Sequence, residues 1–383
     1  MKNKLIKCTI ILVIVAALGA ALWQLNSFEK TEMVSMKGYS YEKAVVTEVV
    51  TDNLQPDGQR AGYQLLKVMI KSGSHKGEIY EATSSEGNLF GATCYKGDKV
   101  IVTFSVSGDN ATVGVYSKDR TLAVLAYVAV FLALICCIGG FNGIKSVIGL
   151  IFTFAMIIFM LLPMIYLGMS PFWAAVIMVV VTTIVTMYLI GGNDRKTISA
   201  ILGTTLGVLI SGLSAWIFGL AADIDGYNVS NIETLVYLGQ NTQIKIGGLL
   251  FAGILIASLG AVMDVAMSVS SAIAEIHDKS KTLGMKELFI SGMHVGKDMM
   301  GTMSNTLILA FAGGSISVLV LDYAYNLPLR QIINSYSIGI EIMQGIAGSI
   351  GVILTVPTTA FMAALLYGAK RNITVHSSQE DTQ

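Results

Sequence analysis

Charge is scarce in this 383-residue chain, because only 13% of its residues are charged, against roughly 25% in ordinary soluble domains. The 25 basic and 25 acidic residues cancel, so there is no basic surplus to neutralise nucleic-acid phosphates. Hydrophobic residues make up 54% of the chain, which excludes a soluble globular enzyme and a disordered protein. Residues 24–120 carry 23 of the charges, and the 263 residues that follow carry 24. The sequence therefore joins one segment of soluble composition to a membrane segment.

Cysteine is also rare, since three of the four cysteines lie in apolar runs and Cys94 stands alone in the polar segment. No disulfide is therefore expected within that segment. The chain also lacks a phosphate-binding loop, a nucleophile elbow and a paired-cysteine motif. We expect neither an enzyme nor a bound cofactor or metal.

Eight apolar runs are long enough to cross a membrane core of about 30 Å. They are residues 5–22, 121–138, 147–167, 172–190, 198–221, 246–265, 299–321 and 338–367. We interpret residues 1–23 as an uncleaved anchor, because Trp23 and Gln24 make a poor signal-peptide cleavage context. The other predicted parts are a polar domain at 24–120, a seven-helix membrane domain at 121–370 and a tail at 371–383.

Basic residues occupy alternate loops, and this sets the expected orientation because Lys and Arg accumulate on the cytoplasmic side. The predicted cytoplasmic set is Lys2, Lys4, Lys7, Lys145, Arg195, Lys196, Lys279, Lys281, Lys286, Lys297, Lys370 and Arg371. We therefore predict a multipass plasma-membrane protein with both termini in the cytoplasm. Residues 24–120 are then extracytoplasmic.

The polar domain alternates apolar and polar residues at 63–70 and 99–106, with turn signals at 72–74, 96–98 and 107–110. This is the pattern of strands joined by hairpins. We predict a small β-barrel or sandwich of five or six strands, and the five-stranded barrel that binds oligomers is one candidate. No aromatic stripe for stacking on such a ligand is evident, so a spacer or assembly domain is the alternative.

Small and acidic residues share one face of the sixth predicted span and its continuation. They are Gly253, Ala257, Gly260, Asp264, Ser268, Ser271 and Glu275. Small residues let another helix approach closely, and an ionisable residue at membrane depth faces the bundle interior or water. Counted from Ile246, Asp264 is expected in the cytoplasmic half of the membrane or near its inner interface.

The seventh predicted span begins with a second polar face, formed by His294, Asp298, Gly301 and Asn305, with Lys297 beside it. A salt bridge that only fixes helix packing is the alternative to a functional role. Residues 286–294, ahead of this face, are amphipathic. Both an interfacial helix and a re-entrant segment fit them.

The last predicted span carries Glu341, Gln344, Thr355 and Thr358, and its Pro357 predicts a kink because proline has no N–H to donate. Glycines at every third or fourth position favour close helix packing. The predicted packing or kink positions are Gly203, Gly207, Gly260, Gly348, Gly351 and Pro357.

The polar residues of the last three spans are all expected in the inner half of the membrane, where they would form one cavity open to the cytoplasm. The candidate site residues are Asp264, Ser268, His294, Lys297, Asp298, Asn305, Thr355 and Thr358. A polar path without an energy-converting motif favours transport of a small solute or ion, coupled to an ion gradient if it is active.

Three stretches, residues 259–271, 291–310 and 348–358, resemble the YibE/F-like family of bacterial multipass membrane proteins. The resemblance covers roughly residues 121–370. It implies a bacterial membrane protein but no particular activity, because the family has no established biochemical function.

Two alternatives to transport stay open. In the first, the chain is a membrane scaffold or complex subunit whose outer β domain binds envelope components. In the second, Asp264 and Asp298 act as a pair in a membrane-embedded enzyme. The expected partners are the lipid bilayer, a small solute or ion, and either a second copy or another membrane protein, and no nucleic acid is expected.

Overall fold

The computed structural model describes residues 17–33, 38–56, 58–85, 92–107, 110–229 and 232–368. The chain divides into two compact units, residues 31–137 and residues 1–30 with 138–383. Most of the predicted first span and the whole predicted tail lie outside the described residues.

The first unit contains five strands that close into a barrel in the order β1-β2-β3-β5-β4. The strands are β1 (Tyr39–Thr51), β2 (Tyr63–Ile70), β3 (Ile79–Ser85), β4 (Lys99–Ser107) and β5 (Asn110–Lys118). All pairings are antiparallel except that of β3 with β5. Two register irregularities bend β1, which pairs with β2 along its second half and with β4 along its first. The barrel alternative of the sequence prediction is therefore confirmed.

The barrel core follows from the period of two in the strands. In β2, Gln64, Leu66, Val68 and Ile70 are buried and alternate with more exposed residues. Phe104 and other apolar side chains of the remaining strands fill the same core, together with Cys94. The polar alternation read from the sequence thus gives the inward and outward faces correctly.

The two units meet within α2 (Thr121–Met156), an apolar helix whose backbone is non-helical at Gly140, with φ 53° and ψ −131°. The sequence predicts two spans here, and Gly140 lies between them. The part of α2 that follows Gly140 continues through a short π-helix, η1 (Ile157–Leu161), into α3 (Leu162–Tyr166). A positive φ is costly for residues with a Cβ atom, so glycine permits this break.

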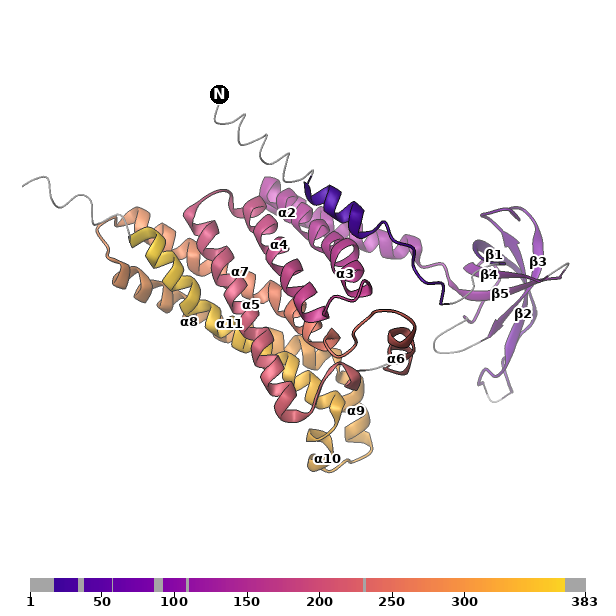
Figure 1. Cartoon of the computed structure of the whole chain (residues 1–383). Helices are drawn as coiled ribbons and strands as arrows, with labels where there is room; N and C mark the ends of the chain where they lie inside the picture. Colours follow the sequence, from indigo (N-terminus) through magenta and orange to yellow (C-terminus); the bar gives the residue numbers. More distant parts are fainter. Residues whose placement is uncertain are drawn as a thin grey trace, which may run out of the picture. The chain divides into compact units, whose positions relative to one another are not determined.

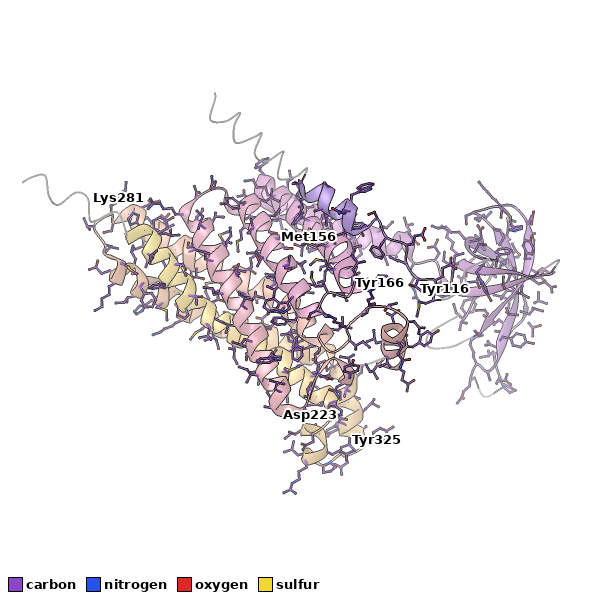
Figure 2. All side chains as sticks on the ribbon, viewed as in Figure 1. Tyr116, Met156, Tyr166, Asp223, Lys281 and Tyr325 are labelled. Carbon is purple, nitrogen blue, oxygen red and sulfur yellow. The ribbon has the colours of Figure 1, made fainter. Side chains whose placement is uncertain are left out.

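The second unit is a helix bundle (Figure 1) in which α11 (Tyr336–Gly368) packs against three helices. Its neighbours are α5 (Arg195–Ala222), α7 (Leu249–Lys279) and α8 (Met285–Gly314), and α4 (Pro171–Gly191) packs against α5 and α7. Lys281 lies at one end of this bundle, and Asp223 and Tyr325 lie at the other (Figure 2). Short elements follow the bundle helices at the second end: η2 (Gly226–Asn228), α6 (Ile232–Asn241), α9 (Ile316–Ala324) and α10 (Leu329–Ile333).

Residues 17–25, the described end of the predicted anchor, are helical and belong to the second unit. Leu22 and Leu25 pack against its apolar core. Asn26 Nδ2 donates a hydrogen bond to the Phe159 carbonyl at 2.7 Å, and the Phe28 ring stacks on Tyr166.

Two expected helix boundaries are wrong. The sixth predicted span, 246–265, is the first half of α7, because the helix continues through its small polar residues as long as Val269 and Ile273 remain buried on the opposite side. The seventh, expected at 299–321, is α8 from Met285 to Gly314, followed by a 62° bend into α9. Residues 286–294 are therefore the beginning of α8 and do not form a separate helix.

Within the described residues, five helices are long and apolar enough to cross a membrane, and the bent pair α8 and α9 would make a sixth. The protein is membrane-embedded by this criterion. The eight predicted spans include residues 5–22, most of which lie outside the described part, and two runs that α2 and α3 join into one helical stretch.

Candidate functional site

The contact between α5 and α11 is built from glycines that face hydroxyl residues. A Cβ atom placed on Gly203 would overlap the Thr359 side chain, and one on Gly207 would overlap the Thr355 hydroxyl. A Cβ atom on Gly351 would lie 2.8 Å from Ser211 Cβ. The backbones of the two helices therefore approach as closely as the missing side chains permit.

Gly348 belongs to the same core, where an added Cβ atom would lie 2.6 Å from Leu307 Cδ2 of α8. Gly260 differs from the other predicted packing glycines, because no atom lies within 4 Å of the position its Cβ would occupy. Among the described residues, no other helix packs against the position of its missing side chain.

The hydroxyls of Thr355 and Thr358 form hydrogen bonds with their own helix. Thr355 is fully buried, and its hydroxyl donates to the Gly351 carbonyl at 2.7 Å. Thr358 donates to the Leu354 carbonyl at 2.9 Å. Both hydroxyls thus bond within α11, which runs through Pro357 as one helix.

Asp264 lies in the middle of α7, about 22 Å from either helix end. The side of α7 that carries Val262 and Leu255 packs into the bundle, whereas Asp264 is exposed and Ser268 is half-buried. The residues that continue the face toward the other end, Gly253 and Ala257, are exposed too.

The polar face of α8 also points away from the bundle. The opposite side packs tightly, since a Cβ atom on Gly296 would overlap Val356 and one on Gly292 would lie 2.5 Å from Ile273 Cδ1. The exposed residues are His294, Lys297, Asp298, Gly301, Thr302 and Asn305. Among the described residues, no hydrogen bond or ion pair is seen for the side chains of Lys297, Asp298 or Asn305.

Contacts between the helices relate the positions of Asp264 and Asp298. Gly207 faces both Thr355 and Val262, and Gly296 faces Val356, so these residues form one layer of the bundle. Asp264 and Asp298 each lie two residues, or about 3 Å, from this layer, and because α7 and α8 run in opposite directions they lie on opposite sides of it. Their separation along the bundle is therefore about 6 Å, and both side chains are exposed.

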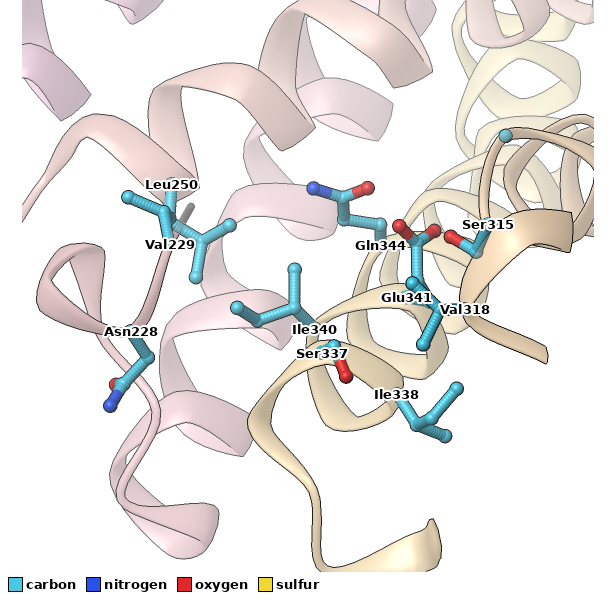
Figure 3. Close-up of a pocket in the computed structure, with 11 residues that line it drawn as sticks. Asn228, Val229, Leu250, Ser315, Val318, Ser337, Ile338, Ile340, Glu341 and Gln344 are labelled. Carbon is cyan, nitrogen blue, oxygen red and sulfur yellow. The ribbon is translucent and has the colours of Figure 1, made fainter. Parts of the chain in front are cut away.

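A cavity of about 490 Å³ lies at the other end of the bundle, where α8 gives way to α9 (Figure 3). The Ser315 hydroxyl and the Glu341 carboxylate turn toward one another, with Gln344 beside them. Asn228 and Ser337 add further polar groups, and the eleven lining residues include no Lys, Arg or His. The sequence carried a signal for this site, because Glu341 is the one charged residue in the last predicted span.

The barrel holds a polar network of its own. Gln64 receives a hydrogen bond from the Cys94 backbone N–H at 2.8 Å and donates to Asp52, and Arg60 also donates to Asp52. The Arg60 hydrogen bond holds the pKa of the Asp52 carboxyl below its usual range, while burial raises the pKa of the Cys94 thiol. Asp52 is thus charged and Cys94 is an unreactive thiol at neutral pH.

Three exposed tyrosines gather on the outer face of the barrel, where the sequence suggested no aromatic stripe. Tyr41 pairs with Thr103 of β4, which pairs in turn with Gly114 of β5. Tyr116, two residues further along β5, approaches Tyr41 edge to face with ring centroids 5.4 Å apart. Tyr39 lies two residues before Tyr41 and is also exposed. Pairing across strands, which sequence spacing does not reveal, creates this face.

Comparison with known proteins gives one family match: the family described as YibE/F-like protein matches residues 127–369. No curated protein and no solved structure matches the chain. The matched region contains α4 to α11 and every residue that lines the cavity.

Proposed function

Because this chain belongs to the YibE/F-like family, whose match covers the helix bundle, we propose that it transports a small cation or cationic solute across the plasma membrane. The observation that carries the proposal is the cavity at the α8–α9 bend, lined by Glu341. In the proposed orientation, the bundle end with Arg195, Lys281 and Lys286 faces the cytoplasm. The cavity and the barrel are then extracytoplasmic.

The chemistry of the lining favours a cation. Glu341 supplies one carboxylate, and the side chains of Gln344, Ser315 and Ser337 supply neutral oxygens, while the Asn228 side-chain oxygen accepts from the Asp225 N–H at 2.8 Å. The carboxyl end of α8 adds the negative end of a helix dipole, and its last carbonyls have no partner further along the helix. Broken helices that present such groups to a ligand recur in membrane transporters.

The bundle is closed beneath the cavity. One helical turn below Gln344, Gly348 packs against Leu307, and the next turn holds the close contact between Gly351 and Ser211. A cavity open at one end above a packed layer is what alternating access requires of one of its states. Transport then needs a rearrangement of α8 or α11 that opens this layer.

The test is ligand-dependent stability of the purified full chain. Na⁺, K⁺, Mg²⁺ and the diamine putrescine are added separately at constant ionic strength, and thermal unfolding is followed. A cation that binds only the folded protein stabilises it by about 2.7 kcal/mol at 100 times its Kd. Glu341→Gln abolishes this stabilisation, and uptake of the same cation into liposomes is lost with it.

The matched control is Glu233→Gln, an exposed carboxylate in α6 at the same end of the bundle. This variant keeps the stabilisation and the uptake. The transport proposal is wrong if none of the four cations stabilises the protein, or if Glu341→Gln responds as the unchanged protein does.

A second candidate function is supported by the tyrosine face of Tyr39, Tyr41 and Tyr116. Exposed aromatic rings on a five-stranded barrel suit stacking on a polymer such as an envelope glycan. Under this alternative, the barrel binds an envelope component and the helix bundle serves as its membrane scaffold. The cavity would then have no ligand.

A further inference from the structure

The sides of α7 and α8 that face away from the bundle form a continuous polar strip, the α7–α8 face. On α7 it consists of Gly253, Ala257, Gly260 and Asp264, and on α8 of His294, Lys297, Asp298, Gly301 and Asn305. The two helices pack directly against each other. An added Cβ atom on Gly253, Gly260 or Gly301 meets no atom within 4 Å, so nothing in the described part of the chain covers the strip.

Lipid is an unsuitable neighbour for this face. Asp264 lies within a helix of 31 residues, and Asp298 lies about 6 Å from its level along the bundle. Ionisable side chains within a membrane-spanning helix normally face protein or water rather than lipid. The exposed side of α11 shows the contrast, because Ile346, Ile353 and Phe361 suit lipid.

The described segments at the edges of the bundle do not reach this face. The helix at residues 17–25 is held on the far side of the chain's second unit, where Asn26 bonds to Phe159 and Phe28 stacks on Tyr166. A partner that covers the α7–α8 face must therefore offer small residues for close packing and charged residues of both signs.

We propose that a second copy of this chain covers the α7–α8 face. In a two-fold interface the same patch meets itself, so residue i of one copy contacts residue j of the other and the reverse. The α7–α8 face is self-complementary in this sense, because it carries Asp264 and Asp298 together with Lys297 and His294. Lys297 of each copy pairs with Asp264 of the other, and the stripe of Gly253, Ala257 and Gly260 lets the two α7 helices approach closely.

This interface does not depend on cation binding in the cavity, which lies at one end of the bundle. It pairs charges between the copies that the described part of one chain leaves exposed. The dimer is therefore the form in which the polar residues of α7 and α8 become internal.

Disulfide cross-linking in native membranes tests the proposal. In full-length protein with Cys8, Cys94, Cys136 and Cys137 replaced by Ser, Ala257→Cys is oxidised with copper phenanthroline and the products are separated by mass. A band of twice the chain mass is expected. The control is Leu213→Cys, because Gly212 faces Leu255 and Leu213 is therefore an exposed α5 residue at similar depth. It should give no such band.

Charge exchange tests the pairing. Lys297→Asp in the Ala257→Cys protein places like charges together and reduces dimer formation by about tenfold. Adding Asp264→Lys restores opposite charges across the two-fold axis and recovers the band. Equal cross-linking at Ala257 and Leu213, an adduct with a protein of another mass, or an unchanged band for Lys297→Asp would each overturn the proposal.

Discussion

Single glycines decide how closely the helices of this protein approach. At Gly203 and Gly207 the missing Cβ atom leaves room for Thr359 and Thr355, whereas at Gly260 and Gly301 it leaves open space. The sequence predicts a close-packing role for Gly203, Gly207 and Gly260 alike, since all three recur at helical spacing. Spacing identifies a face but does not say which partner lies against it.

Gly207→Ala tests this distinction, because the added methyl group overlaps the Thr355 hydroxyl. Overpacking of this kind costs about 1–3 kcal/mol, so we expect a lower unfolding temperature for the purified protein. Thr355→Ala in the same chain removes the hydroxyl and should recover part of the loss.

The control for Gly207→Ala is Gly313→Ala in α8, where an added Cβ atom meets nothing within 4 Å. Exchanging glycine for alanine inside a helix stabilises by up to about 1 kcal/mol. Equal unfolding temperatures for the two variants would show that α5 and α11 are not in close contact.

Among the elements, the bend between α8 and α9 is the feature that hydropathy could not predict. Residues 299–321 are apolar enough on average to form one span, and although Gly313, Gly314 and Ser315 stand at the break, average hydropathy does not reveal the 62° change of direction there. The barrel strands were more predictable, because alternation and turn residues mark both the strands and their ends. The order of the strands around the barrel was not predictable, because it is set by pairing between distant parts of the chain.

Gly314→Leu tests whether the bend builds the binding site. Gly314 lines the cavity, and an added Cβ atom there meets nothing within 4 Å, so leucine fills the cavity without overlapping the core. We expect cation stabilisation to be lost. Without cation, the free energy of unfolding should stay within about 1 kcal/mol of that of the unchanged protein. Retained stabilisation would place the cation elsewhere.

At the scale of the whole molecule, composition alone separates residues 24–120 from the membrane part, and the two compact units of the structure divide after Cys137, within α2. The arrangement of the predicted site residues was harder to predict. These residues were chosen by helical face and depth, and in the described part of the chain the α7 and α8 faces turn outward, whereas Thr355 of α11 is fully buried. A sequence gives the polar side of a helix, but the side that meets other helices depends on the whole bundle.

Replacing residues 31–119 with a short flexible linker removes the barrel and distinguishes the two candidate functions. If the bundle is the transporter, the shortened protein still inserts in membranes, and the cation that stabilises the full chain stabilises it equally. A scaffold that works through the barrel loses its cellular role in the same variant. Loss of cation binding, with the bundle folded, would contradict a bundle that binds on its own.

The pairing of β1 with β4 also orders events during synthesis. β1 cannot complete its pairing until β4 has been made. β5, the parallel partner of β3, ends at Lys118, immediately before α2 begins at Thr121. Non-local pairing of this kind is slow, because the chain between the partners must be ordered first. The barrel therefore cannot close until the ribosome has passed its last strand and has begun α2. Until then the apolar side chains of its strands are open to chaperones and proteases, at a time when most of the membrane helices have not yet been made.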